Sequence, residues 1–124
     1  MKTKWQDLHD RLFMIAQVQV GNDNVYDYRQ LEDVAYPFVD FNDSDWFAIG
    51  TKNGGAIQKF NFTLNVWSEI EDLKNLSKYA ENIMSQASKI KGFTLIVNES
   101  SMKYSIDRTV TPYVRRAMII LTFR

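Results

Sequence analysis

The most constraining feature of this 124-residue sequence is a change of hydrophobic period within residues 56–89. Phe60, Phe62, Leu64 and Val66 alternate with polar residues, which is the pattern of a strand with one buried face. The apolar residues that follow recur at helical spacing and form one stripe: Ile70, Leu73, Leu76, Ala80, Ile83, Met84 and Ala87. The segment therefore predicts a strand that runs into a helix, both burying apolar side chains in a shared core.

Two short motifs predict where the helices begin. Ser68-Glu69-Ile70-Glu71 fits the capping box, in which a hydroxyl and a carboxylate bind free backbone N–H groups. It predicts that the second helix starts at Ser68. Thr3-Lys4-Trp5-Gln6 is a similar motif, and the apolar residues after it predict a first helix that ends near residues 19–21.

Three further segments are expected to be extended strands or turns. Val25-Tyr26 reads as a short extended piece before the charged residues 27–33, and 35–41 reads as a strand whose Pro37 end is unpaired or at an edge. Residues 43–55 predict a long hairpin that turns at Asn53-Gly54-Gly55, and within it residues 46–49 either extend the previous strand or lie on a mobile loop.

Three more expectations concern the C-terminal third of the chain. Residues 93–98 predict a strand, and alternation of Met102, Tyr104 and Ile106 suggests another. Residues 113–123 are apolar on both faces, which is typical of a central strand or of one covered by a partner. The prediction is one α+β domain over 1–124, with a mainly antiparallel four- to five-stranded sheet, two helices on one face, and mobile loops at 43–55 and 98–111.

Composition excludes several classes of function. Fifteen basic residues balance fifteen acidic ones, which argues against a protein whose main task is to bind duplex nucleic acid. There is no cysteine and only one histidine, so the usual zinc sites and cysteine nucleophiles are absent. No apolar run resembles a signal peptide or reaches the roughly 20 residues of a membrane span. We expect a soluble domain made inside the cell, with no cofactor, no metal and no enzymatic activity.

The remaining candidates for chemistry have simpler interpretations. His9 is expected to be solvated or to flank the apolar stripe of the first helix. The acidic run 40–45 invites a calcium site, but it lacks the spacing of an EF-hand loop, so a turn capped by Asx side chains is favoured. Phe60 and Phe62 beside Lys59 could stack on single-stranded nucleic acid, although their alternation favours the core.

Apolar residues outside the predicted core are the strongest functional signal. Trp46, Phe47 and Ile49 lie in a segment flanked by turns, and Trp67 falls on the polar face of its strand. Such a cluster is typical of a protein–protein surface, and the alternative is that it caps the end of the sheet. The basic residues Arg108, Arg115, Arg116 and Arg124 form a modest C-terminal cluster, which solvated or intersubunit ion pairs explain as well as a ligand would.

The chain resembles the tail-completion or tail-terminator proteins of long-tailed bacteriophages, including tail-to-head joining proteins. The resemblance rests on Tyr36-Pro37-Phe38-Val39, on Phe62-Thr63-Leu64-Asn65-Val66-Trp67-Ser68 before a helix, and on the final strand ending Ile119-Ile120-Leu121-Thr122-Phe123. It extends over most of the chain, and the hydrophilic segment 98–111 departs from it.

The resemblance implies a virion protein, assembled in the host cytoplasm, that caps the head-proximal end of the tail tube. It would stop tail polymerisation and join the tail to the head as a hexameric ring, with DNA passing through the lumen without specific binding. Its partners would be further copies of itself, the tail-tube protein and a head-completion or connector protein, while the isolated chain could be a monomer. The expected interface residues are Asp43, Asp45, Trp46, Phe47, Ile49, Lys52, Trp67, Arg108, Arg115 and Arg116.

Two alternatives to the terminator role stay open. One is another head-to-tail adaptor or stopper protein of the connector. The other is a small nucleic-acid-binding α+β module.

Overall fold

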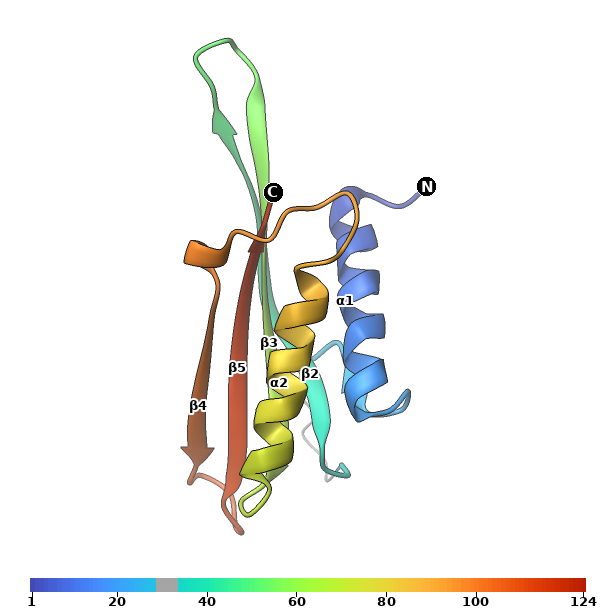
Figure 1. Ribbon diagram of the computed structural model, residues 1–124, viewed down its shortest axis with the longest axis vertical. Helices are drawn as coiled ribbons and strands as arrows, with labels where there is room; N and C mark the ends of the chain where they lie inside the picture. Colours follow the sequence, from blue (N-terminus) through green and yellow to red (C-terminus); the bar gives the residue numbers. More distant parts are fainter. Residues whose placement is uncertain (29–33) are drawn as a thin grey trace.

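The computed structural model describes residues 1–28 and 34–124, which form a sheet and two α-helices (Figure 1). The elements are α1 (Lys4–Val20), β1 (Val25–Tyr26), β2 (Phe38–Gly50), β3 (Ala56–Glu69), α2 (Leu73–Ala87), the 3₁₀ turn η1 (Val97–Glu99), β4 (Ser101–Asp107) and β5 (Val114–Phe123). Of the charged segment 27–33, residues 29–33 lie outside the described residues.

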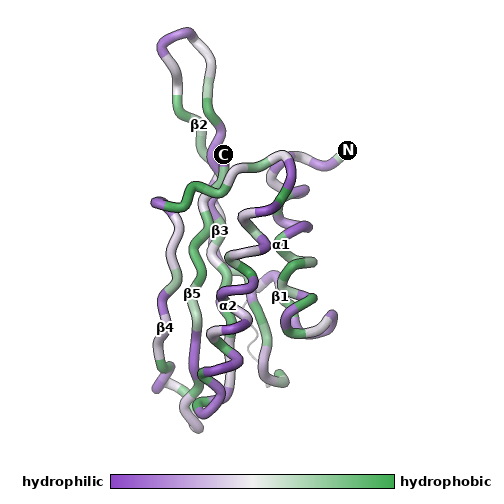
Figure 2. Tube along the Cα trace, viewed as in Figure 1, coloured by the Kyte–Doolittle hydropathy of each residue, from purple (hydrophilic) through white to green (hydrophobic). Residues whose placement is uncertain are grey.

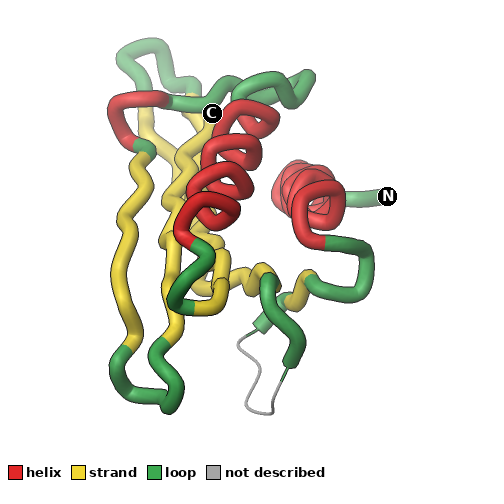
Figure 3. The backbone as a smooth tube through the Cα atoms, turned by 60° about the horizontal axis from the view of Figure 1, so that its bottom comes forward, coloured by secondary structure: helices red, strands yellow, loops and turns green. Residues whose placement is uncertain are grey.

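The strands form one sheet in the order β1-β2-β3-β5-β4. Only β1 and β2 are parallel, and the other neighbours are antiparallel. Both helices lie on one face of the sheet (Figure 3). The predicted α+β class with a mainly antiparallel sheet is confirmed. β5 is an interior strand, between β3 and β4, and the helices cover one of its faces (Figure 3). We call the face without helices the open face.

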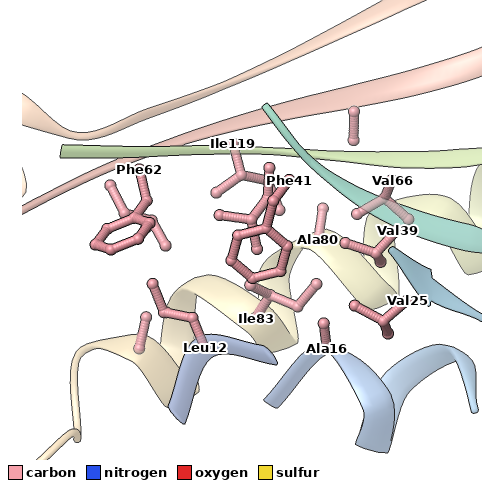
Figure 4. Packing of buried hydrophobic residues seen from close by; sticks show 14 of the residues in the cluster. Leu12, Ala16, Val25, Val39, Phe41, Phe62, Val66, Ala80, Ile83 and Ile119 are labelled. Carbon is pink, nitrogen blue, oxygen red and sulfur yellow. The ribbon is translucent and has the colours of Figure 1, made fainter. Parts of the chain in front are cut away.

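The core lies between the helices and the sheet, as the alternation in β3 predicted. Phe60, Phe62, Leu64 and Val66 are all buried, and they meet α1 and α2 (Figure 4). The helices contribute Leu8, Leu12 and Ala16 from α1, and Leu76, Ala80, Ile83 and Ala87 from α2.

The two predicted helix starts have different outcomes. Thr3 is the N-cap of α1, and its Oγ1 accepts a hydrogen bond from Gln6 N at 3.1 Å. The motif at Ser68 does not cap α2, because Ser68 and Glu69 continue β3 and pair with Arg115 and Val114 of β5. The ladder with β5 keeps these residues extended, so α2 starts only at Leu73 after a turn. Ile70 therefore precedes the helix.

Two predicted strands are corrected, and a third is confirmed. β2 begins at Phe38, after Pro37, and extends through Gly50, so residues 43–50 are strand and not loop. Residues 93–98 form no strand: Leu95 makes a single bridge to Phe123, and the chain then turns through η1 to enter β4. The segment 98–111 contains β4, as the alternation there suggested. The mobility of 43–55 and 98–111 stays a prediction.

Candidate assembly surface

β2 and β3 continue beyond the rest of the sheet as a two-stranded arm, which we define as residues 46–59 (Figure 1). β5 pairs with β3 no further than Phe60, so within the described ranges no third strand supports the arm. Its turn is closed by a hydrogen bond from Thr51 N to the Gly55 carbonyl, and Gly54 has a φ of 78°. Only glycine adopts this conformation without strain, and the hairpin turn predicted here is confirmed.

Large apolar side chains are exposed on both faces of the arm. Trp46, on the side of the helices, is 56% exposed, and Phe47, Ile49 and Ile57, on the opposite side, are 39%, 44% and 42% exposed. Apolar stretches of the arm flank a hydrophilic tip (Figure 2). Single exposed apolar residues are ordinary, whereas several on one projection mark an interaction surface.

The structure separates the predicted interface residues into two groups. Asp45, Lys52 and the apolar residues above lie on the arm or at its base, and Asp43 lies next to them where β2 bulges between Phe41 and Ser44. Arg108 follows β4 at the opposite end of the sheet, and Arg115 and Arg116 lie near that end. The arm alone therefore carries a continuous candidate surface.

Arg115 and Arg116 make contacts within the chain. Arg115 Nε donates to the Ile70 carbonyl at 2.6 Å, which ties β5 to the turn before α2. Arg116 Nε donates to Asn65 Oδ1 at 2.8 Å, and its guanidinium lies 5.4 Å from the centre of the Trp67 ring. Sequence reasoning did not find these bonds, because they join residues about 45 and 51 positions apart.

Trp67 is buried, which corrects the expectation that it is an exposed anchor. It is 6% exposed, stacks with Phe38 and joins a small second cluster with Val114 on the open face. Its Nε1 donates to Asp40 Oδ2 at 3.0 Å, and Asn65 Nδ2 donates to Asp40 Oδ1 at 2.9 Å. The alternation placed Trp67 on the correct face, but β2 and β5 supply apolar neighbours there. The same bonds show that Asp40 belongs to a strand interior, so the Asx-turn interpretation of 40–45 is wrong.

His9 is also more enclosed than expected, since its side chain is 13% exposed. Its Nε2 lies 2.6 Å from Asp27 Oδ1 and its Nδ1 lies 3.0 Å from Asp10 Oδ1. The ring stacks on Trp5 and packs against Phe41. These contacts connect α1 with the chain after β1. The Lys2 ammonium beside Asp10 holds the pKa of that carboxyl well below its usual range, and bonds from His9 and Gln6 act in the same direction.

Metal-ligand groups, cavities and membrane-spanning helices are the other features of the described residues that bear on function. Across residues 1–28 and 34–124 there is no group of three or more histidine, cysteine, aspartate or glutamate side chains that could hold a metal ion. A cavity of about 380 Å³ lies at the base of the arm between Lys4, Phe60, Phe93 and Arg124. In the part of the chain that the structure describes, no helix is long and apolar enough to cross a membrane.

Comparisons with known proteins show a likeness of fold to solved structures. No protein-family model matches the sequence, and no curated protein matches it. Among solved structures, the fold matches a chain of the virion of a native gene transfer agent particle, with a TM-score of 0.57 and 13% sequence identity. The match covers 99% of this chain and 98% of that chain. The chain thus shares, over nearly its whole length, the fold of a component of a gene transfer agent virion.

Proposed function

We propose that this chain is a structural protein of a phage-like virion. In this proposal it caps the head-proximal end of the tail tube, ends tail polymerisation and joins the tail to the head as a ring of identical subunits, hexameric in the virion. Tail-tube and connector proteins are its other partners, and DNA passes through the lumen without specific binding. The role is architectural and not enzymatic.

The observation that carries the proposal is the arm. A projecting hairpin with four exposed large apolar residues promotes association with other chains. Such a surface is expected in a protein that works within an assembly. The full-length likeness to a gene transfer agent virion chain supports the same class of function. The sequence resemblance to tail-completion proteins supports the more specific role.

The two alternatives differ in their support. A head-to-tail adaptor or stopper would use a similar arm, so nothing in the arm separates it from a terminator. A single-strand-binding module is less well supported, because Phe60 and Phe62 are 2% and 1% exposed and leave no ring face for bases to stack on.

Electron microscopy of particles assembled without this protein tests the proposal. Overlong tails that lack heads would support the terminator role. Tails of normal length beside filled, tailless heads would support the adaptor role instead. Normal virions would refute both, and complementation with the unaltered chain is the control.

A further inference from the structure

The sheet has two free edges of similar length. β1 pairs only with Val39 and Asp40 of β2, so no described strand pairs with the outer edge of β2 from Asn42 to Gly50. Among the described strands, β4 pairs with β5 alone, so no described strand pairs with its other edge. On β2, the seven residues 44–50 pair with β3 in unbroken register, and β4 also contains seven residues. The two edges therefore match in length.

Both edges are only partly protected against pairing. Natural proteins protect edge strands with prolines, several charges or covering loops. On β2 such protection is confined to Asp43, Asp45 and the bulge between Phe41 and Ser44, and the edge beyond them presents Trp46, Phe47 and Ile49. β4 carries one lysine, Lys103, and one acid at its end, Asp107, and presents Tyr104 at 40% exposure. Both edges are therefore competent to extend the sheet with another chain.

We propose that a second copy of this chain fills each edge: β4 of one subunit pairs with the free part of β2 in the next subunit. The contact is heterologous, since two different edges meet, and repeated contacts of this kind generate a ring if the rotation closes. The inference rests on the proposed function, because it specifies how the proposed ring is held together.

Strand direction fits this pairing. β2, β3, β5 and β4 alternate in direction, so β4 runs opposite to β2. Rotation about an axis to which the strands are inclined by well under 90° keeps their sense along that axis, so it brings β4 antiparallel to the neighbouring β2. This is the more stable type of ladder.

The heights of the two edges also fit a closed ring. Tyr104 of β4 and Val66 of β3 both pair with Ala117 of β5, so these two residues lie at the same height on the sheet. Trp46 pairs with Phe60, which lies six residues from Val66 along β3. Six residues span about 20 Å along a strand, and the four strand steps from one β4 to the next span about 19 Å across the sheet. Strands of such a ring would tilt by about 45° from its axis, close to the roughly 35–45° of closed β-barrels.

Side-chain chemistry favours a register with Trp46 opposite Tyr104. Both lie on the helix side of the sheet, as directly opposed residues must, and aromatic cross-strand pairs are stabilising. On the open face this register sets Ile49 opposite Ser101 and puts Asp45 diagonal to Lys103. The opposite charges of that diagonal pair add a favourable contact.

Disulfide crosslinking tests the contact directly, because the chain contains no cysteine of its own. Ser101→Cys is combined with Ile49→Cys or with Phe47→Cys, which share the open face, and with Ala48→Cys as the matched control on the other face. All four positions are exposed, so folding is expected to be unaffected. Directly opposed Cα atoms lie about 4.5–5.5 Å apart, within disulfide range. The purified full-length protein, over a range of concentrations, and particles that contain it are oxidised.

Either same-face pair is expected to give a ladder of oligomers, and the better pair identifies the register. Each single-cysteine variant should stop at dimers. The inference is overturned if no same-face pair forms a ladder in protein or particles, or if the Ala48 control crosslinks equally well. Rings seen by electron microscopy without these crosslinks would refute the pairing but not the virion role. Crosslinked ladders together with normal virions in the absence of the protein would refute the virion role but not the pairing.

Discussion

The strands β2 and β3 run through two different parts of the molecule: the body, where the helices cover them, and the arm, where they project alone. The two parts differ in what covers their apolar side chains. In the body of the sheet, Val39, Phe41, Phe62 and Leu64 are covered by α1 and α2 and are at most 5% exposed. In the arm, apolar side chains of the same size are about half exposed. The apolar side chains of the body are buried by helices of the same chain, whereas those of the arm are suited to burial by another chain. The following predictions test this contrast, from the largest expected effect to the smallest.

The body should lose much stability when a core ring is removed. Phe62→Ala deletes a ring that is 1% exposed and stacks 5.5 Å from Trp5. We expect a loss of about 3–5 kcal/mol in the free energy of unfolding, measured by chemical denaturation. Ile57→Ala in the arm is the control. A similar loss from both variants would remove the distinction between body and arm.

The buried carboxylate of the open face should matter less than the core ring but more than the arm. Asp40→Ala leaves Asn65 Nδ2 and Trp67 Nε1 without the acceptor that each uses. A loss of about 1–3 kcal/mol is expected, because these buried donors stay desolvated. Denaturant titration followed by far-ultraviolet circular dichroism measures it. An unchanged midpoint would show that water replaces the carboxylate at no cost.

Strain in the turn of the arm should stay local. Gly54→Ala forces a β-carbon into a backbone with φ of 78°, at about 1–2 kcal/mol. Hydrogen exchange at the Thr51 and Gly54 amides should become faster, while exchange in β5 stays unchanged. Slower exchange in the arm, or faster exchange throughout β5, would contradict an arm that opens independently of the body.

Arm side chains should affect assembly without affecting folding. Trp46→Ala removes an exposed ring whose only described hydrogen bond is a long one, 3.4 Å from Nε1 to Gln58 Oε1. The change in unfolding free energy should stay within about 0.5 kcal/mol, as for other surface substitutions. Assembly into particles, scored by electron microscopy, should fall sharply. Normal assembly by this variant would exclude Trp46 from the interface.

The smallest expected effect concerns Asp10, which lies at the surface of the body. Its pKa is lowered below the ordinary 3.8, chiefly by Lys2, so its ion pair adds stability above that value and loses it as the pH falls further. Wild type should exceed Asp10→Asn in stability at neutral pH, and the difference should shrink in acid and in high salt. Denaturation curves at several pH values measure it. A difference that persists unchanged at pH 2 would contradict this assignment.

Sequence reasoning performed best where one local rule decided the outcome. The alternation of Phe60 to Val66 identified the core face of β3, Thr3 identified the start of α1, and Asn53-Gly54-Gly55 identified the hairpin turn. Each of these depends on residues that are neighbours in the sequence. The exposure of Trp46, Phe47 and Ile49 was predicted for the same reason, since turn-forming residues flank them on both sides.

Tertiary structure decided the features that depend on residues brought together from far apart. Ser68 and Glu69 fit a helix cap, yet β5 offered them a ladder and extended β3 instead. Trp67 and Asp40 are buried because Phe38, Asn65 and Val114 gather around them, and His9 is held because Asp27 reaches it from the segment after β1. The sequence by itself determined the period, the turns and the apolar faces, because these follow from backbone geometry over a few residues. Only the folded chain determined which of those faces its own elements cover and which the arm leaves for a partner.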